Sequence, residues 1–459
     1  MIQDLTVGDS GKVLLRYTIP MFVSVAFQQI YNIADSMIAG KFAGKDALAA
    51  VGASYPVTMI FMAVAVGCNI GCSVVISQLF GARAYEKLKT AVCTTLFAGF
   101  LISVLLTAAG LAATPAMMRL IQTPDNIFAD GALYLRIYIG GFVFLFLYNV
   151  TTGMFNSLGD SKTPLYFLIG SSVGNILLDL LFVAVFHWGV AGVAWATFLA
   201  QGAACVLALF AFRRRLAEVK TEGKVQFFST EVLMKIAFVA VPSILQQSFI
   251  SIGNIFIQGL VNSYGSDVIA GYSAAIKLNT FIITGLTTLG NGISGFAAQN
   301  LGAGKPARVR ECYRAGVKMA ICVSIPFFIG FFFFGKAMML LFMEGTSGLA
   351  METGILFLRI VSPFYFIISI KLTADGVLRG AEAMRYFMIA TFTDLILRVI
   401  LAFIFSAWFE AAGIWMSWPA GWCVGTLLSV VFYRTVIKKL AADGSGKEKA
   451  AAQSGQKTT

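Results

Sequence analysis

Residues 19–44 read IPMFVSVAFQQIYNIADSMIAGKFAG, and residues 241–267 read VPSILQQSFISIGNIFIQGLVNSYGSD. Each stretch is long and apolar enough to cross a bilayer, because a span needs about 20 apolar residues to cross about 30 Å of hydrocarbon. The two stretches also share landmarks: Pro20 matches Pro242, and Asn32 matches Asn254. They therefore predict one membrane-spanning helix that occurs in both halves of a duplicated chain.

Further matches follow in the same order along the chain, at offsets of 221–223 residues. They are Gly44-Lys45-Asp46 with Gly265-Ser266-Asp267, Ser77-Gln78-x-x-Gly81-Ala82 with Ala298-Gln299-x-x-Gly302-Ala303, Leu135-Arg136-Ile137 with Leu358-Arg359-Ile360, Gly153 with Gly376, and Gly192 with Gly413. Halves with an even number of spans enter the membrane in the same direction, so we expect a parallel repeat around a central cleft, with alternating access by rocking. An old duplication retained for stability alone is the alternative.

Composition restricts the class of protein. The 459 residues are 58% hydrophobic and 12% charged, whereas soluble proteins are about 25% charged. A soluble core cannot hold this much apolar side chain. The composition excludes a soluble enzyme, a disordered protein and a disulfide scaffold, and the seven cysteines lie in or beside apolar runs, as small buried residues do.

Apolar runs predict an all-α membrane protein of twelve spans in two six-helix bundles. The spans are 15–40, 53–79, 90–113, 131–157, 164–187, 190–212, 236–262, 270–299, 312–336, 353–378, 385–408 and 411–436. We expect an N-terminal lobe at 1–212, a linker at 213–235, a C-terminal lobe at 236–437 and a disordered tail at 438–459.

The net charge of +12 reflects topology and not nucleic-acid binding. Twenty-five Lys and Arg residues lie in one set of alternating loops and chain ends, and four lie in the opposite set. Cytoplasmic loops carry the excess of basic residues. We therefore expect a multi-pass protein of the cell membrane, with both termini and the linker in the cytoplasm and no nucleic-acid partner.

Four acidic residues fall inside predicted spans: Asp35, Asp179, Asp375 and Asp394. An ionised carboxylate at the bilayer centre costs roughly 2.5–3.5 kcal/mol on insertion scales. Such residues face the protein interior or water and are functional candidates.

The first span places polar groups on one helix face, because Gln28, Tyr31, Asn32 and Asp35 are spaced i, i+3, i+4 and i+7. Pro20, upstream in the same span, removes a backbone hydrogen bond and predicts a bend. An acid satisfied by a neighbouring helix, without a role in transport, is the alternative for Asp35.

Asn175 and Asp179 are four residues apart in the fifth span, and Thr197 lies in the sixth, after a short turn. Antiparallel helices joined by a short loop are neighbours, so we expect Thr197 at the depth of Asp179. With Asp35 these residues form an oxygen-only set that suits Na⁺. Two buried carboxyls also share a proton readily. Packing through polar side chains is the alternative for Asn175 and Asp179.

The second half departs from this pattern. Ile257, beside Gln258, stands where the repeat would place an acid, and the span 236–262 contains none. Asp394 and Arg398 are four residues apart and can neutralise each other, and Lys371 and Asp375 repeat this spacing. We favour structural ion pairs here over substrate contacts.

The run YNIADSMIAGKFAG (31–44), the paired SQLFGA (77–82) and AQNLGA (298–303), and GNILLD (174–179) resemble the multidrug and toxic compound extrusion (MATE) family, with the DNA-damage-inducible F-like branch nearest. The resemblance implies a secondary antiporter that exports organic, often cationic, amphipathic compounds against Na⁺ or H⁺. It implies a cation site at Asp35, Asn175, Asp179 and Thr197, with Tyr31 and Asn149 in the network. It also implies that the first span bends at Pro20 when the acid is protonated.

We expect the substrate cavity to be lined by polar and charged residues of both halves: Gln28, Asn32, Asn254, Gln258, Asp394 and Arg398. The chain has no GxxxxGK[ST] motif, so ATP does not drive transport, and we expect no cofactor, no enzymatic activity and a monomer. The alternatives are a lipid or oligosaccharide-lipid flippase of the same superfamily, a major-facilitator transporter and a membrane receptor or scaffold. The major-facilitator loop pattern G-x-x-x-D-R-x-G-R-R is absent.

Overall fold

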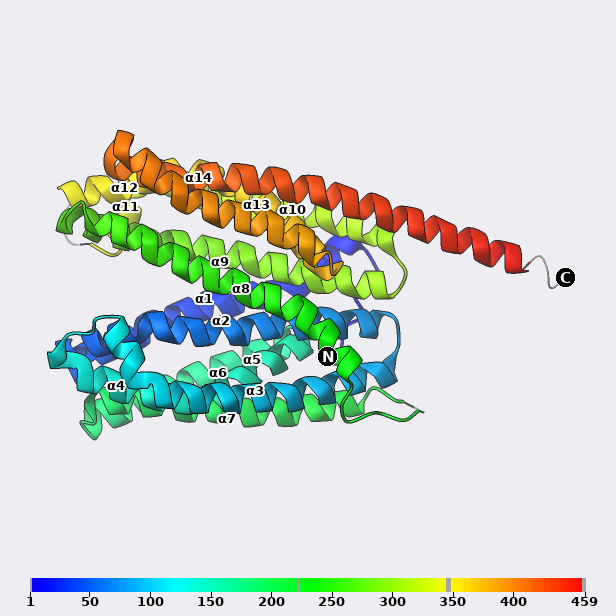
Figure 1. The fold of residues 1–459 in the computed structure, drawn as a ribbon, viewed down its shortest axis with the longest axis horizontal. Coiled ribbons are helices and arrows are strands. Elements are labelled where there is room, and N and C mark those ends of the chain that lie inside the picture. The colour runs from blue at the N-terminus through cyan, green and yellow to red at the C-terminus, as the bar shows by residue number, and fades with distance from the viewer. Residues whose placement is uncertain (1, 222, 344–347, 456–459) are drawn as a thin grey trace. The chain divides into compact units, whose positions relative to one another are not determined.

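The computed structural model describes residues 2–221, 223–343 and 348–455, and every regular element in these ranges is a helix. By length and composition, ten of the described helices can cross a membrane, and α4 (Asp125–Gly140) with α5 (Phe142–Ser157), bent by 47°, forms an eleventh span. One of the ten, α14 (Met384–Gly455), is interrupted by non-helical backbone at Phe409 and Glu410 and turns back there (Figure 1). Its arms, 384–408 and 411–440, each exceed the about 20 residues of a span. The described residues therefore contain the twelve spans that the sequence predicts.

The remaining helices follow one another with short connections. Their bounds are α1 Ser10–Ile38, α2 Lys45–Gly81, α3 Tyr85–Leu120, α6 Lys162–Asp179, α7 Gly189–Ala217, α8 Thr230–Asn262, α9 Ser266–Gly302, α10 Pro306–Phe333, α11 Gly335–Met339, α12 Leu349–Val361 and α13 Tyr365–Gly380. Short π-helical segments extend α1 over Ala39–Ala43 and α6 over Leu180–Val185, and a 3₁₀ turn at Ser362–Phe364 joins α12 to α13.

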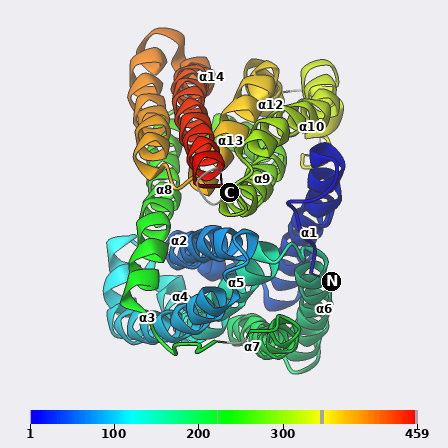
Figure 2. The same ribbon diagram turned by 90° about the vertical axis from the view of Figure 1, so that its right-hand side faces the viewer.

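The chain packs as two compact units, which are not divided at the linker. Unit 1 contains Ile19–Ser251 with residues 2–4, and unit 2 contains Leu5–Thr18 with residues 252–455. Helices α1 and α8 each contribute to both units (Figure 2). The linker packs on α3, where the hydroxyls of Thr90 and Thr94 accept hydrogen bonds from the backbone N–H groups of Gln226 and Ser229 at 3.1 and 3.0 Å.

The end of the chain is helical as far as Gly455, and the disorder expected at 438–459 stays a prediction. Helix α14 continues to Gly455, through most of the stretch 438–459. Ala, Lys, Glu and Gln, which are frequent there, are good helix formers, and this composition accounts for the continuation. Residues 456–459 lie outside the described ranges.

The repeat is visible in the backbone where the second span of each half begins. Gly44 precedes α2 with φ 94° and ψ 173°, and Gly265 precedes α9 with φ 92° and ψ 170°. Residues with a Cβ rarely adopt this conformation, whereas glycine does so at little cost. The sequence match between 44–46 and 265–267 therefore corresponds to the same turn in both halves.

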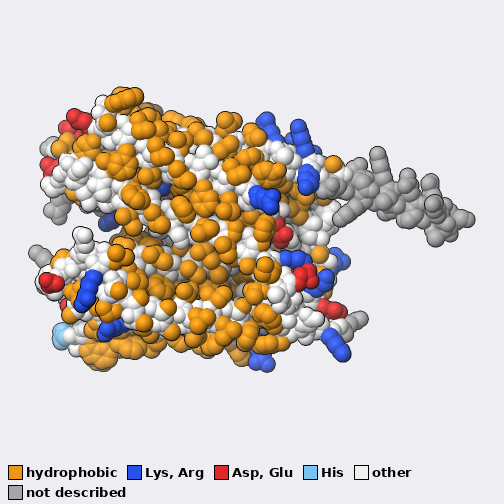
Figure 3. Space-filling model, in the orientation of Figure 1, with side chains coloured by type: hydrophobic (Ala, Val, Ile, Leu, Met, Phe, Trp, Pro, Cys, Tyr) orange, Lys and Arg blue, Asp and Glu red, His pale blue; other side chains and the backbone are white. Residues whose placement is uncertain are grey.

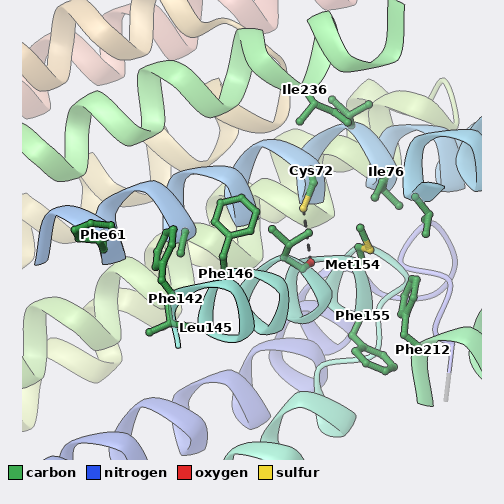
Figure 4. Packing of buried hydrophobic residues seen from close by; sticks show 14 of the residues in the cluster. Phe61, Cys72, Ile76, Phe142, Leu145, Phe146, Met154, Phe155, Phe212 and Ile236 are labelled. Carbon is green, nitrogen blue, oxygen red and sulfur yellow. Dashed lines mark hydrogen bonds between the residues drawn. The ribbon is translucent and has the colours of Figure 1, made fainter. Parts of the chain in front are cut away.

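The core of unit 1 is built from aromatic and aliphatic side chains of α2, α3, α4, α5, α7 and α8, part of which Figure 4 shows. Phe61 meets Phe142, and Phe155 meets Phe212, each pair edge to face with ring centroids 5.0 Å apart. Cys72 is fully buried among them, and its thiol donates to the carbonyl of Val150 at 3.8 Å. This cysteine is a packing residue, as its apolar setting predicts.

The surface has the polarity that a bilayer requires. On the face that Figure 3 shows, apolar side chains cover the middle of each unit, and Lys, Arg, Asp and Glu gather toward the ends of the helices. Exposed apolar residues in the middle of spans include Leu105 at 69% exposed and Leu427 at 65% exposed. A soluble protein would not leave a continuous apolar band of this extent in water.

Gly153 and Gly376, matched by the repeat, each allow a close helix contact within their unit. A Cβ on Gly153 of α5 would lie 2.8 Å from the carbonyl oxygen of Asn69 in α2. A Cβ on Gly376 of α13 would overlap the carbonyl oxygen of Gly290 in α9. Both glycines thus set the distance between two buried helices.

We expect Gly376→Ala to lower the melting temperature, because the added methyl meets backbone and the helices must separate, at a cost of about 1–3 kcal/mol. Gly330→Ala is the matched control, since a Cβ on Gly330 of helix α10 would have no neighbouring atom within 4 Å. Thermal unfolding of both purified variants in detergent tests this expectation. Equal melting temperatures for the two variants would contradict the assigned role of Gly376.

Candidate functional site

The site begins on the second half of α1, which belongs to unit 1. Tyr31 and Asp35 are one turn apart, so both side chains leave the same face of the helix. The Tyr31 hydroxyl donates to the Asn175 side-chain oxygen at 2.7 Å, which ties α1 to α6. Pro20 is buried in the same helix, next to the point where α1 passes from unit 2 to unit 1.

Helices α6 and α7 supply the opposite side. Asn175 and Asp179 are 2% and 0% exposed, and the Asn175 amide nitrogen lies 3.5 Å from the Thr197 hydroxyl oxygen. The Thr197 hydroxyl donates to the carbonyl of Val193 at 3.1 Å and accepts from Asn175, so one lone pair of its oxygen stays available. The structure thus brings together Tyr31, Asp35, Asn175, Asp179 and Thr197.

The carboxyl groups of Asp35 and Asp179 face each other at interaction distance. One oxygen of Asp35 and both oxygens of Asp179 are buried and accept no hydrogen bond from the described residues. The ion pairs found among the described residues of unit 1 involve neither carboxyl. Two buried carboxyls without a donor or a cation require a shared proton or a bound cation, because an uncompensated buried charge costs several kcal/mol.

Two further residues belong to this site and do not appear in the sequence prediction. Tyr134 of α4 lies close enough to both carboxyls to interact electrostatically, and its ring stacks on Tyr138 at 6.3 Å. Gln201 lies one helical turn after Thr197, and its buried side-chain oxygen has no partner among the described residues. The spacing from Thr197 was a usable signal for Gln201. Nothing in the sequence distinguishes Tyr134 from other membrane tyrosines.

A cavity of about 200 Å³ adjoins the carboxyl pair within unit 1. Side chains with oxygen atoms form much of its lining, including Ser24, Gln28, Tyr31, Tyr148, Asn149, Thr152, Ser171, Ser172, Asn175, Thr197 and Gln201. Asn149 lines the cavity, and its amide donates to the carbonyl of Leu145 on its own helix at 2.9 Å. Asn32, on the same helix as Gln28, is exposed and is not part of the lining.

Both helices that carry the carboxyls change their winding directly after them. The π-helical segment Ala39–Ala43 begins four residues after Asp35, and Leu180–Val185 begins immediately after Asp179. π-Helical turns are less regular than α-helical ones and recur at functional sites. The carboxyls therefore lie where the backbone of each helix deviates from the regular α-helix.

The donor set accommodates Na⁺ or H⁺. No group of three or more His, Cys, Asp or Glu side chains converges among the described residues, so any ion here would rely on the two carboxylates and neutral oxygens. Thr197 can supply a hydroxyl oxygen, whereas the Asn175 oxygen already accepts from Tyr31. Oxygen-only ligands suit a hard cation, and the same two carboxyls can share one proton.

Unit 2 also contains buried carboxylates, but these have cationic partners. The Lys371 ammonium lies 2.8 Å from Asp375 and 3.5 Å from Asp394. The hydroxyl of Ser429 donates to the other oxygen of Asp375 at 2.6 Å. The unit therefore contains the Lys371–Asp375 pair that the spacing predicts, extended to a third helix segment.

The pairing expected between Asp394 and Arg398 is not among the ion pairs of the described residues, so Lys371 replaces Arg398 as the partner of Asp394. Arg398 lies over the ring of Trp418 at 4.5 Å and reaches the Asn254 side-chain oxygen at 3.5 Å. A long side chain on one helix face can satisfy either partner, and the sequence spacing alone does not decide. Gln258, expected in the substrate cavity, donates to Asn262 at 2.8 Å on its own helix.

Lys371→Met is expected to destabilise the protein by about 3–5 kcal/mol, because it removes the ammonium that forms ion pairs with two buried carboxylates. The triple variant K371M/D375N/D394N should recover part of that loss, since both carboxylates that Lys371 pairs with are then uncharged. Lys235→Met is the matched control: Lys235 forms the same i,i+4 ion pair with Glu231 at 2.7 Å, but both side chains are exposed. Chemical or thermal unfolding of all three variants measures the difference, and a loss for K371M as small as that for K235M would refute the assignment.

Comparisons with known proteins bear on this geometry. The MatE family model matches residues 20–181 and 242–404, which together form most of the chain and repeat at the offset found in the sequence. The chain is 29% identical to a probable multidrug resistance protein, YoeA, of Bacillus subtilis, covering 92% of this chain and 93% of that protein. It is 28% identical to a second one, YpnP, covering 94% and 96%.

Solved structures share the fold. One is described as the outward-facing conformation of a multidrug resistance MATE family transporter of the MOP superfamily, with a TM-score of 0.89, 23% identity, and coverage of 96% of this chain and 98% of that chain. Another, a MOP superfamily transporter from Pyrococcus furiosus, has a TM-score of 0.88 at 23% identity and covers 95% and 98%. Family model, relatives and fold agree: the chain belongs to the MATE family of membrane transporters.

Proposed function

We propose that this protein is a secondary active multidrug efflux antiporter, which exports organic, often cationic amphipathic compounds in exchange for Na⁺ or H⁺. The relatives YoeA and YpnP are named as probable multidrug resistance proteins, and MepA of Staphylococcus aureus, 24% identical over 81% of this chain, as a multidrug export protein. The observation that carries the ion coupling is the buried pair Asp35 and Asp179, which has no cationic partner among the described residues.

The pair couples ion binding to conformation through the energy of buried charge. With a proton or Na⁺ bound, the carboxyls can stay in a closed, low-dielectric site. Without it, their negative charge requires water, because an ionised carboxylate inside the membrane costs roughly 2.5–3.5 kcal/mol even on insertion scales. The loaded and unloaded carriers thus prefer differently hydrated conformations, and an ion shifts the balance by its differential affinity for them.

Helix α1 connects the state of the carboxyls, loaded or unloaded with the ion, to the conformation of unit 1. It carries Asp35 and Tyr31 on one face, and Tyr31 holds α6 through Asn175 at 2.7 Å. Pro20 removes a backbone hydrogen bond upstream, so α1 bends there more easily than elsewhere. When the carboxyls are neutralised, the contacts of this face change and α1 bends at Pro20, the cavity of unit 1 closes, and substrate leaves it. Neighbouring solved structures are described as MATE in bent and in straight conformations.

Coupling is confined to unit 1 in this scheme. In unit 2 the Lys371 ammonium already forms ion pairs with both carboxylates, at the place where an exchangeable ion would otherwise bind. A permanent side-chain cation cannot dissociate during a cycle, so Asp375 and Asp394 act as structural groups. One ion per cycle is then expected, and exchange of one cation for one monovalent organic cation is electroneutral. A second inward charge would add about 2.3 kcal/mol per 100 mV.

The protein acts as a monomer in the cell membrane, with both termini in the cytoplasm. The uneven distribution of Lys and Arg between alternating loops supports this orientation. The coupling ion is the only non-protein component required, and small organic molecules and the bilayer are the partners.

Asp35→Asn and Asp179→Asn are each expected to abolish gradient-driven efflux while the protein still folds, because an amide cannot bind and release a proton or hold a cation by charge. Efflux of a fluorescent organic cation from inverted vesicles measures this. Asp130→Asn is the matched control, since Asp130 is an exposed carboxylate of α4 and its loss should leave efflux unchanged. Normal efflux by either variant of the buried pair would end the proposal.

The identity of the ion can be read from Thr197. If Na⁺ is the coupling ion, Thr197→Ala should raise the Na⁺ concentration for half-maximal efflux by about tenfold, because one oxygen ligand is lost. A pH gradient should then drive no efflux in either the unchanged protein or the variant. If H⁺ couples, a pH gradient drives efflux in both proteins, and Thr197→Ala changes neither rate by more than about twofold. Vesicles energised separately by each gradient distinguish these results, and no response to either gradient would exclude ion coupling.

A further inference from the structure

An open groove of about 710 Å³ lies on unit 2, between α10, α13 and the second arm of α14. Its apolar walls include Val317, Ile370, Leu427 and Val430. No Asp or Glu takes part in the lining. The groove shares no residue with the carboxyl site or its cavity, which lie in unit 1.

The groove opens on the outer surface of this six-helix bundle. Helix α13 packs on α9 through Leu372 and Gly376, whereas Ile367 and Ile370, which line the groove, lie on the opposite side of the helix by the 100° rotation per residue. Neighbouring residues of α14 are apolar and exposed, with Leu427 at 65% and Val431 at 47%. In a membrane-spanning unit such a surface faces lipid chains.

Three cations gather at one end of the groove. Arg314 and Lys318 come from α10, and Arg434 comes from α14. None of them takes part in an ion pair of the described residues. Glu311, the nearest acid along α10, instead accepts a hydrogen bond from the Ser10 hydroxyl at 2.7 Å. The end of the groove therefore has positive charge without compensation.

The dimensions match one leaflet. From Cys423 to Arg434 the groove follows α14 for 11 residues, about 16 Å at 1.5 Å per residue, which is roughly half of the 30 Å hydrocarbon core. Beside the cations, the rings of Tyr313 and Tyr433 stack with centroids 3.9 Å apart. Tyrosines of this kind mark the level of lipid headgroups.

We propose that this groove is a binding site for an anionic phospholipid. The headgroup phosphate is held by Arg314, Lys318 and Arg434. Each guanidinium group can donate two parallel hydrogen bonds to two phosphate oxygens, and the lysine ammonium adds a point charge. One acyl chain lies along Val430 and Leu427 toward Cys423. A free phosphate would pair with the cations but leave this apolar channel unfilled. A zwitterionic lipid would fill the channel, but its headgroup has no net negative charge to balance the three cations. Basic pockets between membrane helices bind anionic headgroups in this way.

The test uses the purified full-length chain and lipid titration followed by native mass spectrometry, with phosphatidylglycerol and phosphatidylcholine of identical chains. We expect tighter binding of phosphatidylglycerol. In R314Q/R434Q its affinity should fall about 25-fold, since each cation contributes about fivefold. The matched control is R213Q/R214Q, which removes two exposed arginines from the end of α7 in unit 1 and should bind like the unchanged protein.

A second variant keeps the charges and fills the channel. Cys423→Trp places a large ring on an exposed position of the lining, and it should weaken long-chain phosphatidylglycerol more than the dihexanoyl form. Equal affinity for the two headgroups, equal losses in both arginine double variants, no effect of Cys423→Trp, or full displacement of the lipid by inorganic phosphate would each overturn the proposal. Because binding is measured without transport, its failure is distinct from failure of the efflux proposal.

Discussion

The negative charge of two buried carboxyls is the constraint on which the working parts of this protein depend. Asp35 and Asp179 come from different helices, face each other, and have buried oxygens that no described donor satisfies. In water such a pair would be unremarkable, but inside the membrane its charge must be compensated. No cationic group among the described residues supplies the compensation, and in the proposed mechanism it comes from an ion that enters and leaves. Three neighbouring features relate to that requirement: the cavity, the Tyr31–Asn175 hydrogen bond, and the π-helical segments that follow both carboxyls.

The two units show how one repeated backbone can carry opposite electrostatics. Gly44 and Gly265 make the same turn, and Gly153 and Gly376 allow the same close approach of helices. Yet the carboxylates of unit 2 form ion pairs with Lys371, whose ammonium lies within 4 Å of both Asp375 and Asp394. In unit 2 the cation is a side chain and stabilises one fixed arrangement. In unit 1 no described side-chain cation pairs with the two carboxyls, which leaves room for an exchangeable ion. Duplication thus preserved the packing while the chemistry of the two units diverged.

Much of the site was predictable because helices have a regular period. The spacing of Tyr31 and Asp35, and of Asn175 and Asp179, defines faces that must point inward if charge is not to meet lipid. Tyr134 could not be found in this way, since tyrosine is common in membrane proteins and its role depends on which helix lies beside α4. The partner of Asp394 was also ambiguous, because Lys371 and Arg398 are both within reach of a long side chain.

By itself the sequence determined the class of fold, the number of spans, the duplication and the residues whose charge needs an explanation, because these follow from apolar length, repetition and the cost of charge in hydrocarbon. Only the tertiary structure decided which charges meet. It placed Asp35 against Asp179, gave Lys371 to Asp394, took α1 and α8 through both packing units, and gathered three cations beside an apolar groove. Contacts between residues far apart in the chain depend on how helices pack side by side, and local periodicity carries no information about that arrangement.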